Sequence, residues 1–374
     1  MKVLFEVSPL NIGGPQAWVC DIAPALKQRG ISVSVVSFDL VPPKDKVLQG
    51  RLEADGIPTK RIVLEGSRLR KVRMIRAAFQ AMRCDIGHFN SDGFSGPLLY
   101  AAKRCGLGVR ILHSRTPNWG FGGAGLKNRS FHHFFHWLGS RYCTHAFGVT
   151  REALEAMLGA RRMEKTPYWI IPSAICFADV RQIGDRTKSE ACRKTSGPVM
   201  GLIGRITASK NPLFLLDILG VLRNRHTDAR VLFMGYGPEE EKIRQVAAKR
   251  GIGKHITFLP PGENVAEILS EQLDVLVLPS DFEGTPRVVT EAQACGVPVV
   301  CSTAVSADVC AVPELFHRLP LADGAEAWAD GILRASQIRV PRQRIERCFA
   351  RSPLEIGNQA DLLVNLYENF LNGG

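Results

Sequence analysis

The chain contains no apolar run that approaches the roughly 18 residues a membrane-spanning helix requires, so we expect no transmembrane segment. Its first residues, Met1–Val7, carry charges within a short apolar run, which predicts a β-strand rather than a signal peptide. Repeats and low-complexity tracts are also missing. With 374 residues, 45% hydrophobic and 22% charged, the composition is that of a globular protein of two domains. We expect a cytoplasmic location.

Metal-binding patterns are missing as well. The ten cysteines form no C-x-x-C pair, the histidines supply no complementary spacing, and no Asp-x-Asp occurs. These absences predict reduced, mostly buried thiols and no metal site.

The net charge of +12 is unevenly distributed along the chain. Residues 1–172 hold 25 of the 48 Lys and Arg and 12 of the 36 Asp and Glu, which leaves 23 and 24 for residues 173–374. The segment 68–83 alone has six basic residues and no acidic one, interleaved with apolar residues. This pattern favours either an amphipathic helix that docks peripherally on an anionic membrane or a solvated basic helix face. It lacks the context typical of nucleic-acid binding.

Short apolar runs alternate with longer helical patterns in both halves of the chain, which predicts an α/β protein with two Rossmann-like domains and parallel sheets facing across a cleft. The expected strands are 3–7, 32–38, 86–89, 109–113, 146–149, 199–203, 229–234, 256–259, 275–278 and 297–301. We place the first domain at 1–172, the second at 173–352, and a terminal helical segment at 353–374. A polar stretch, 181–197, lies near the boundary. Ligands of such sheets bind beyond the carboxyl ends of the strands.

The segment 281–295 carries two carboxylates, Glu283 and Glu291, across a predicted loop-to-helix junction after an apolar strand. We expect Thr285 to be the N-cap and Pro286 the first helical residue. The free N–H groups there would favour a phosphate or a hydroxyl-rich ligand. Glu291 would lie in an apolar helix and needs a partner, for which a structural salt bridge is the simplest interpretation.

Three other segments lie at the ends of predicted strands. Gly204–Asn211 places Arg205 and Lys210 where they could converge on a diphosphate or form ordinary surface charges. Gly13 and Gly14 follow the first strand and allow close backbone approach to a ligand, or simply a tight turn. His113 ends another strand, where a parallel sheet would expose it to ligand. The aromatic segment 130–137 fits helix packing and an acceptor or membrane surface equally well.

These motifs together resemble the family 4 retaining glycosyltransferases of the glycosyltransferase-B fold, especially those of bacterial capsule and exopolysaccharide synthesis. The family pattern E-G-x-P-x-x-x-x-E-A is matched at 283–292, and G-R-x-x-x-x-K-N is matched at 204–211. Gly235–Glu240 is similar to the family's G-x-G-P turn, and 258–262 would follow near the base. The family's H-S-H stands here as His113-Ser114-Arg115, which implies an altered acceptor contact.

The resemblance assigns roles to individual residues. Glu283 would contact the donor sugar, Glu291 the ribose diol, and Arg205 and Lys210 the diphosphate. Backbone groups at Gly284 and Thr285, and the loop at Gly13 and Gly14, would line the donor. His113 would position the sugar. The first domain, 1–172, would bind the acceptor and the second, 173–352, the nucleotide-sugar donor, and the terminal helix, 353–374, would cross back to the first domain.

The implied function is a metal-independent, retaining hexosyl transfer from a nucleotide diphosphate sugar, expected to be a UDP-sugar, to a hydroxyl of a lipid-linked saccharide. No cofactor is expected besides this co-substrate. We expect a front-face reaction, because no carboxylate stands out as a nucleophile for double displacement. A nucleotide-sugar epimerase on the same fold and a non-catalytic basic binding protein are the alternatives.

Overall fold

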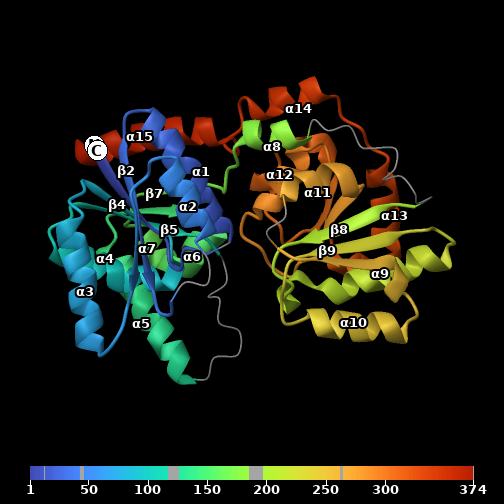
Figure 1. The fold of residues 1–374 in the computed structure, drawn as a ribbon, viewed down its shortest axis with the longest axis horizontal. Helices are drawn as coiled ribbons and strands as arrows, with labels where there is room; N and C mark the ends of the chain where they lie inside the picture. Colours follow the sequence, from blue (N-terminus) through green and yellow to red (C-terminus); the bar gives the residue numbers. More distant parts are fainter. Residues whose placement is uncertain (12, 43–45, 117–125, 185–196, 262–263, 374) are drawn as a thin grey trace. The chain divides into compact units, whose positions relative to one another are not determined.

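The computed structural model describes residues 1–374 except 12, 43–45, 117–125, 185–196, 262–263 and 374 (Figure 1). The chain divides into two compact units. Unit 1 comprises Met1–Ala174 and Ile356–Gly374, and unit 2 comprises Ile175–Glu355. Of the polar stretch expected near the boundary, 181–197, residues 185–196 lie outside the described residues. Each unit is an α/β structure built on one parallel sheet, as the alternating pattern predicts.

Unit 1 contains a seven-stranded sheet in the order β3-β2-β1-β4-β5-β6-β7. The strands are β1 (Lys2–Glu6), β2 (Ser32–Asp39), β3 (Thr59–Val63), β4 (Ile86–Phe89), β5 (Val109–Ser114), β6 (His145–Gly148) and β7 (Tyr168–Ile170). All neighbours are parallel, so their carboxyl ends share one edge. Strands β2 and β3 extend the sheet on one side of β1, and β4 to β7 then extend it on the other side. This reversal is a topological switch point, where open α/β sheets bind ligands.

Helices cover the sheet of unit 1. They are α1 (Gly14–Gln28), α2 (Val47–Ala54), α3 (Arg68–Ala81), α4 (Ser95–Arg104), α5 (Leu126–Tyr142), α6 (Arg151–Leu158), α7 (Ala160–Met163) and α15 (Ile356–Leu371). The terminal helix α15 packs on α1 (Figure 1). There Gln359 accepts a hydrogen bond from the Trp18 indole at 2.5 Å and donates one to the Pro172 carbonyl at 2.8 Å. These buried bonds fix α15 in unit 1.

Unit 2 contains a six-stranded parallel sheet in the order β10-β9-β8-β11-β12-β13. The strands are β8 (Val199–Ile203), β9 (Arg230–Met234), β10 (Ile256–Leu259), β11 (Val275–Leu278), β12 (Val299–Ser302) and β13 (Phe316–Leu319). The helices are α8 (Phe177–Gly184), α9 (Pro212–Asn224), α10 (Glu240–Lys249), α11 (Val265–Gln272), α12 (Arg287–Ala294), α13 (Gly324–Ser336) and α14 (Arg342–Phe349). The central strands β8 and β11 are almost wholly buried, which explains their continuous apolar runs. The switch point lies between β8 and β11.

Two expectations from composition can be compared with these units. Within the described ranges, no helix combines the length and the apolar character that crossing a bilayer requires. The nine described cysteines are free, as expected, but they are not mostly buried: Cys20, Cys143 and Cys301 are buried and the others are partly exposed.

Candidate functional site

The loops that follow β8 and β11 meet at the switch point of unit 2. The Asp281 N–H donates to the Ser209 carbonyl at 2.8 Å, which joins the two loops through their backbones. Because β8 and β11 are neighbours and parallel, both loops leave the same edge of the sheet. This geometry brings the two predicted motifs, 204–211 and 281–295, to one place.

Lys210 and Glu283 are in direct contact. The Lys210 Nζ lies 3.0 Å from the Glu283 Oε1, and the Ser280 hydroxyl donates to the same oxygen at 3.1 Å. Their side chains are 14% and 18% exposed, so the pair is shielded from water yet reachable. An ion pair in this partly buried setting is stronger than one on the open surface. The contact holds one cation and one carboxylate at the sheet edge.

Arg205 lies in the same loop but is exposed. In the part of the chain that the structure describes, its side chain makes no hydrogen bond or ion pair with another residue. The structure therefore does not join Arg205 to Lys210. It leaves the guanidinium at the surface of the loop that carries Lys210.

Glu291 lies inside helix α12, as predicted, and its Oε1 is 3.6 Å from the Arg287 Nη2 one turn earlier. The side chains are 18% and 11% exposed. This ion pair supplies the partner that a carboxylate in an apolar helix requires. It also matches the structural salt bridge that the sequence leaves open as the simplest interpretation.

The start of α12 corrects a prediction by one residue. Pro286, and not Thr285, is the N-cap, and the helix begins at Arg287. Pro286 has a helical φ of −67° but an extended ψ of 110°, so it stands outside the helix. Gly284 is partly exposed and Thr285 is buried, and both precede the helix N-terminus.

Two glycines in the loop after β9 allow it to pack against the loop after β8. A Cβ on Gly235 would lie 2.2 Å from the Gly204 carbonyl oxygen, and one on Gly237 would lie 1.8 Å from the Ile206 carbonyl oxygen. The Ile206 N–H also donates to the Tyr236 carbonyl at 2.8 Å. No side chain fits between these backbones, which gives a physical reason for the Gly-x-Gly spacing.

Phe258 lies in β10 and is only partly exposed. Its ring stacks on Phe233, and the Arg244 guanidinium lies 3.9 Å from the ring centroid. Gly262, at the end of the segment predicted to lie near a base, falls outside the described residues.

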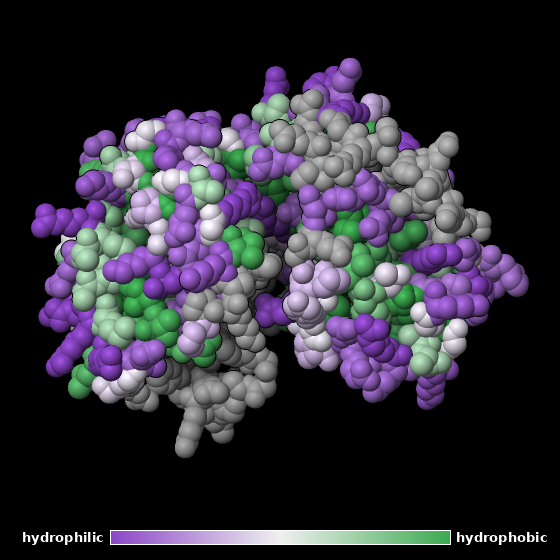
Figure 2. Space-filling model, in the orientation of Figure 1, coloured by the Kyte–Doolittle hydropathy of each residue, from purple (hydrophilic) through white to green (hydrophobic). Residues whose placement is uncertain are grey.

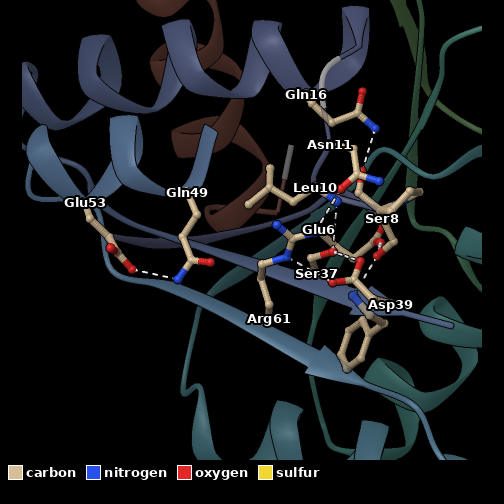
Figure 3. Close-up of polar contacts among 12 residues, drawn as sticks. Glu6, Ser8, Leu10, Asn11, Gln16, Ser37, Asp39, Gln49, Glu53 and Arg61 are labelled. Atoms are coloured by element: carbon tan, nitrogen blue, oxygen red, sulfur yellow. Dashed lines mark hydrogen bonds and ion pairs between the residues drawn. The ribbon is translucent and has the colours of Figure 1, made fainter. Parts of the chain in front are cut away.

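The first glycine loop lies in unit 1. Gly14 begins α1, and Pro15 occupies its first turn. Figure 3 shows how polar contacts fix the loop: the Gln16 amide donates to the Pro9 carbonyl at 2.8 Å, and Arg61 donates to the Asn11 side chain at 3.0 Å. Gly13 has an extended φ of 178°, so its backbone does not require glycine, although a Cβ would crowd Gln16.

His113 is not exposed at the strand end, contrary to the prediction. It is fully buried, with its Nδ1 2.9 Å from the His88 Nε2, and the other nitrogen of His88 lies 2.7 Å from the Tyr367 hydroxyl. Burial is the main cause that lowers the pKa of both imidazoles well below the usual value. The sequence could not show that Trp18 and the terminal helix α15 close over this strand end.

Arg115 is also buried rather than presented to a ligand. Its guanidinium stacks 3.9 Å from the Trp18 ring and donates to the Asn90 carboxamide oxygen at 2.6 and 3.1 Å. Its backbone N–H donates to Asp92 at 2.7 Å. Arg115 is therefore a buried residue that connects Trp18, Asn90 and Asp92 at the sheet edge of unit 1.

Sequence reasoning missed Glu6 and Asp92, which lie near this network. Burial raises the pKa of Glu6 to about 7 and that of Asp92 to about 6. The available signal for Glu6 was an acidic residue at the buried end of the strand, directly after the apolar Val3–Phe5.

Comparison with known proteins defines the class. Residues 12–177 match the family described as "Glycosyltransferase Family 4", and residues 185–347 match "Glycosyl transferases group 1". The fold is shared with solved glycosyltransferases. HepE from Anabaena, in complex with UDP and glucose, superposes with a TM-score of 0.73 at 15% identity over all of both chains. The lipopolysaccharide outer core galactosyltransferase WaaB superposes with a TM-score of 0.67 at 16% identity, over 97% of this chain and all of that one.

A curated relative spans the same length. The putative glycosyltransferase EpsF of Bacillus subtilis is 27% identical over 98% of this chain and 96% of that protein. The protein is a glycosyltransferase, and it belongs to family 4, whose members have the glycosyltransferase-B fold.

Proposed function

We propose that this enzyme is a retaining, metal-independent hexosyltransferase that moves a sugar from a UDP-sugar to a hydroxyl of a lipid-linked saccharide during surface polysaccharide synthesis. The contact between Lys210 and Glu283 at the switch point of unit 2 carries this proposal. A nucleotide diphosphate sugar has an anionic centre and a hydroxyl-rich end. A cation beside a carboxylate complements both groups.

Two relatives support the choice of donor and activity. HepE has been solved with UDP and with UDP-glucose, and EpsF is named as a putative glycosyltransferase. Both align over nearly the whole of this chain. We therefore choose UDP-glucose as the first donor to test.

The chemistry follows from the charges at this edge. When the bond to the sugar breaks, negative charge grows on the departing diphosphate. Lys210, with Arg205 in the same loop, would already be in position before the reaction begins. The two cations would therefore stabilise that charge without reorganisation of the protein. Glu283 would hold donor hydroxyls and Glu291 the ribose diol. The departing phosphate would accept the proton of the acceptor hydroxyl on the same face, which retains the anomeric configuration.

The exposed face of α3 and α5 supports peripheral docking on an anionic membrane. Leu69 is 72% exposed and Trp137 is 54% exposed. Arg70, Arg73 and Arg76 on α3 are also exposed. Helix α3 packs on α4, and α4 packs on α5. Figure 2 shows apolar residues among hydrophilic ones in the region of these helices. Of the aromatic segment 130–137, residues 130–132 have side chains outside the described set.

This face has the chemistry of a lipid-headgroup contact, in which each cation adds about 1 kcal/mol near an anionic surface. Co-flotation with phosphatidylserine vesicles, but not with phosphatidylcholine vesicles, is the expected result. Equal flotation with both kinds of vesicle, or flotation with neither, would contradict the membrane-docking proposal and would leave the transferase proposal unaffected.

Thermal stabilisation by a panel of nucleotide sugars tests the donor proposal. A donor present at 100 times its dissociation constant should add about 2.7 kcal/mol to the free energy of unfolding. We expect UDP-glucose or another UDP-sugar to raise the melting temperature more than GDP- and ADP-sugars do. A panel in which no nucleotide sugar stabilises the protein contradicts the proposal.

A further inference from the structure

The loop that joins β1 to α1 has no helix or strand of its own in its described residues, so its conformation depends on side-chain contacts. It comprises residues 7–13, of which 12 lies outside the described set. Leu10 is fully buried, whereas Asn11 and Gly13 are partly exposed. The loop leaves the first strand at the switch point of unit 1. Whatever fixes it therefore acts on the glycines that begin α1.

Three polar side chains from β2 and β3 converge beside this loop. Ser37 and Asp39 are two residues apart in β2, so their side chains project from the same face of the sheet. Ser37 is the register partner of Arg61 in β3, which places Arg61 on that face as well. The side chains of Arg61 and Asp39 are only 6% and 2% exposed, and Ser37 is fully buried. Strand register thus brings a guanidinium, a carboxylate and a hydroxyl together in the interior.

Asp39 is the centre of this group, and both of its oxygens accept hydrogen bonds (Figure 3). The Arg61 Nε donates to Oδ2 at 3.0 Å, and the Ser37 hydroxyl donates to Oδ1 at 2.7 Å. Each of these two partners also contacts the loop. The Arg61 Nη2 donates to the Asn11 side-chain oxygen at 3.0 Å. The Leu10 N–H donates to the Ser37 hydroxyl at 3.1 Å. One buried carboxylate is therefore connected to two consecutive loop residues by two separate routes.

Stability alone explains this ion pair poorly. Taking a carboxylate and a guanidinium out of water costs free energy that their attraction barely offsets, and apolar residues of similar volume often stabilise a fold equally well. An apolar pair at 39 and 61 could fill the same space. It could not donate to Asn11, nor could it orient the Ser37 hydroxyl that receives the Leu10 N–H. What the ion pair adds is a fixed loop.

We propose that Asp39 and Arg61 are positioning residues for sugar transfer, which hold the loop before α1 in its working conformation. Asp39 fixes the direction of the Arg61 guanidinium, and Arg61 fixes Asn11, two residues before Gly13. Neither charged residue touches a substrate. This role rests on the proposed function, in which the loop at Gly13 and Gly14 lines the donor, and it names the residues that keep that loop in place.

Replacing the ion pair by apolar residues separates positioning from stability. Asp39→Leu/Arg61→Met removes both charges together, so neither is left buried without a partner, and the protein should fold. Asn11→Ala removes only the loop's side of the contact and leaves the ion pair intact. The matched control is Asp21→Leu/Arg51→Met. That pair joins α1 to α2 in the same unit at 2.7 Å, with an aspartate side chain only 4% exposed.

Steady-state kinetics of UDP release from UDP-glucose gives the first measurement. We expect Asp39→Leu/Arg61→Met and Asn11→Ala each to lower kcat by about ten- to a hundredfold, the range for a small misplacement of a group near the reacting atoms. The control should keep the wild-type kcat. Combining Asn11→Ala with the apolar pair should lower kcat no further than the apolar pair does, because both changes remove the same contact.

Calorimetry with UDP distinguishes positioning from damage to the donor site. The affinity for UDP should be the same in all of these proteins, because Lys210, the cation assigned to the diphosphate, lies in unit 2. A general loss of structure would instead weaken UDP binding together with kcat. Melting curves report whether each variant is folded.

Hydrogen exchange tests the loop without any substrate. The Leu10 amide donates to the Ser37 hydroxyl, which loses its own acceptor when Asp39 is replaced. This amide should therefore exchange severalfold faster in Asp39→Leu/Arg61→Met than in the wild type or the control.

A folded apolar-pair variant that keeps the wild-type kcat would overturn the proposal. Unchanged exchange of the Leu10 amide in that variant, or an equal loss of kcat in the control, would also overturn it. If the apolar pair does not fold, Asn11→Ala decides, and an unchanged kcat there rejects the proposal. A wild type that releases no UDP from any UDP-sugar would count against the proposed function, and exchange at Leu10 would still decide whether the ion pair holds the loop.

Discussion

The two sheets end in similar edges with different chemistry. Each unit has a parallel sheet with a reversal beside its first strand. Among the described residues, the edge of unit 2 pairs Glu283 with Lys210 and Glu291 with Arg287, whereas the edge of unit 1 pairs Asp39 with Arg61 and gives Glu6 no ion-pair partner. The overall charge runs the other way, since residues 1–172 hold 25 Lys and Arg against 12 Asp and Glu. The excess of basic residues in 1–172 is therefore a property of the outer surface of unit 1 and not of its sheet edge. The local loops decide what each sheet edge can bind.

Replacing Lys210 by Ala should have the largest effect on this contrast, because it removes the cation that distinguishes the edge of unit 2. We expect turnover with a UDP-sugar to fall by about a hundredfold to a thousandfold, the range for loss of one preorganised donor to a developing anion. Steady-state kinetics of UDP release measures this. Lys249→Ala, an exposed lysine at the end of α10, is the control, and equal activity of the two variants would contradict the role of Lys210.

Replacing a glycine by alanine should lower stability more at the closely packed edge of unit 2 than at the edge of unit 1. Gly235→Ala places a Cβ 2.2 Å from the Gly204 oxygen at a φ of +136°, whereas Gly14→Ala in unit 1 meets nothing within 4 Å. We expect Gly235→Ala to lower the free energy of unfolding by about 1 to 3 kcal/mol or more, and Gly14→Ala to leave it within about 1 kcal/mol. Urea unfolding of both variants checks this. A tolerant Gly235 would mean that the loops after β8 and β9 are not closely packed.

The pH dependence of stability should show the effect of the buried Glu6 carboxylate at the edge of unit 1. The pKa of Glu6 is raised from 4.5 to about 7 in the folded protein, so the folded state holds a proton that the unfolded state has lost between those pH values. Stability is therefore lost as the pH rises from about 4.5 to 7, by about 3 kcal/mol at most for this group.

Glu6→Gln removes that dependence, and the difference between wild type and variant cancels the titration of other groups such as Asp92. Free energies of unfolding measured from pH 5 to pH 8 should show the variant gaining on the wild type as the pH rises. A constant difference across this range would show that Glu6 titrates normally.

The sequence predicts strands well where no charge interrupts an apolar run, as in the edge strand β10, and poorly where charges interrupt it. The central strands β8 and β11 stand out as apolar runs. The edge strands β3, Thr-Lys-Arg-Ile-Val, and β13, Phe-His-Arg-Leu, were not predicted, because half-exposed edge strands carry charges that break an apolar pattern.

The candidate site divides in the same way. Lys210 and Glu283 lie in loops beside neighbouring strands, so strand order and a local motif suffice to bring them together. His113 and Glu6 depend on packing across the whole unit. His113 is enclosed through His88 and Tyr367, and Glu6 through Ser91, residues that sequence spacing could not associate with them.

Calorimetric titration with UDP and with UDP-glucose tests the central claim most directly, because Lys210 is assigned to the diphosphate and Glu283 to the sugar. The account predicts that Lys210→Ala weakens both ligands, and that Glu283→Gln weakens UDP-glucose by about tenfold or more while UDP binds as tightly as before or more tightly. Equal weakening of UDP and UDP-glucose by Glu283→Gln, or no effect of either substitution, would contradict it.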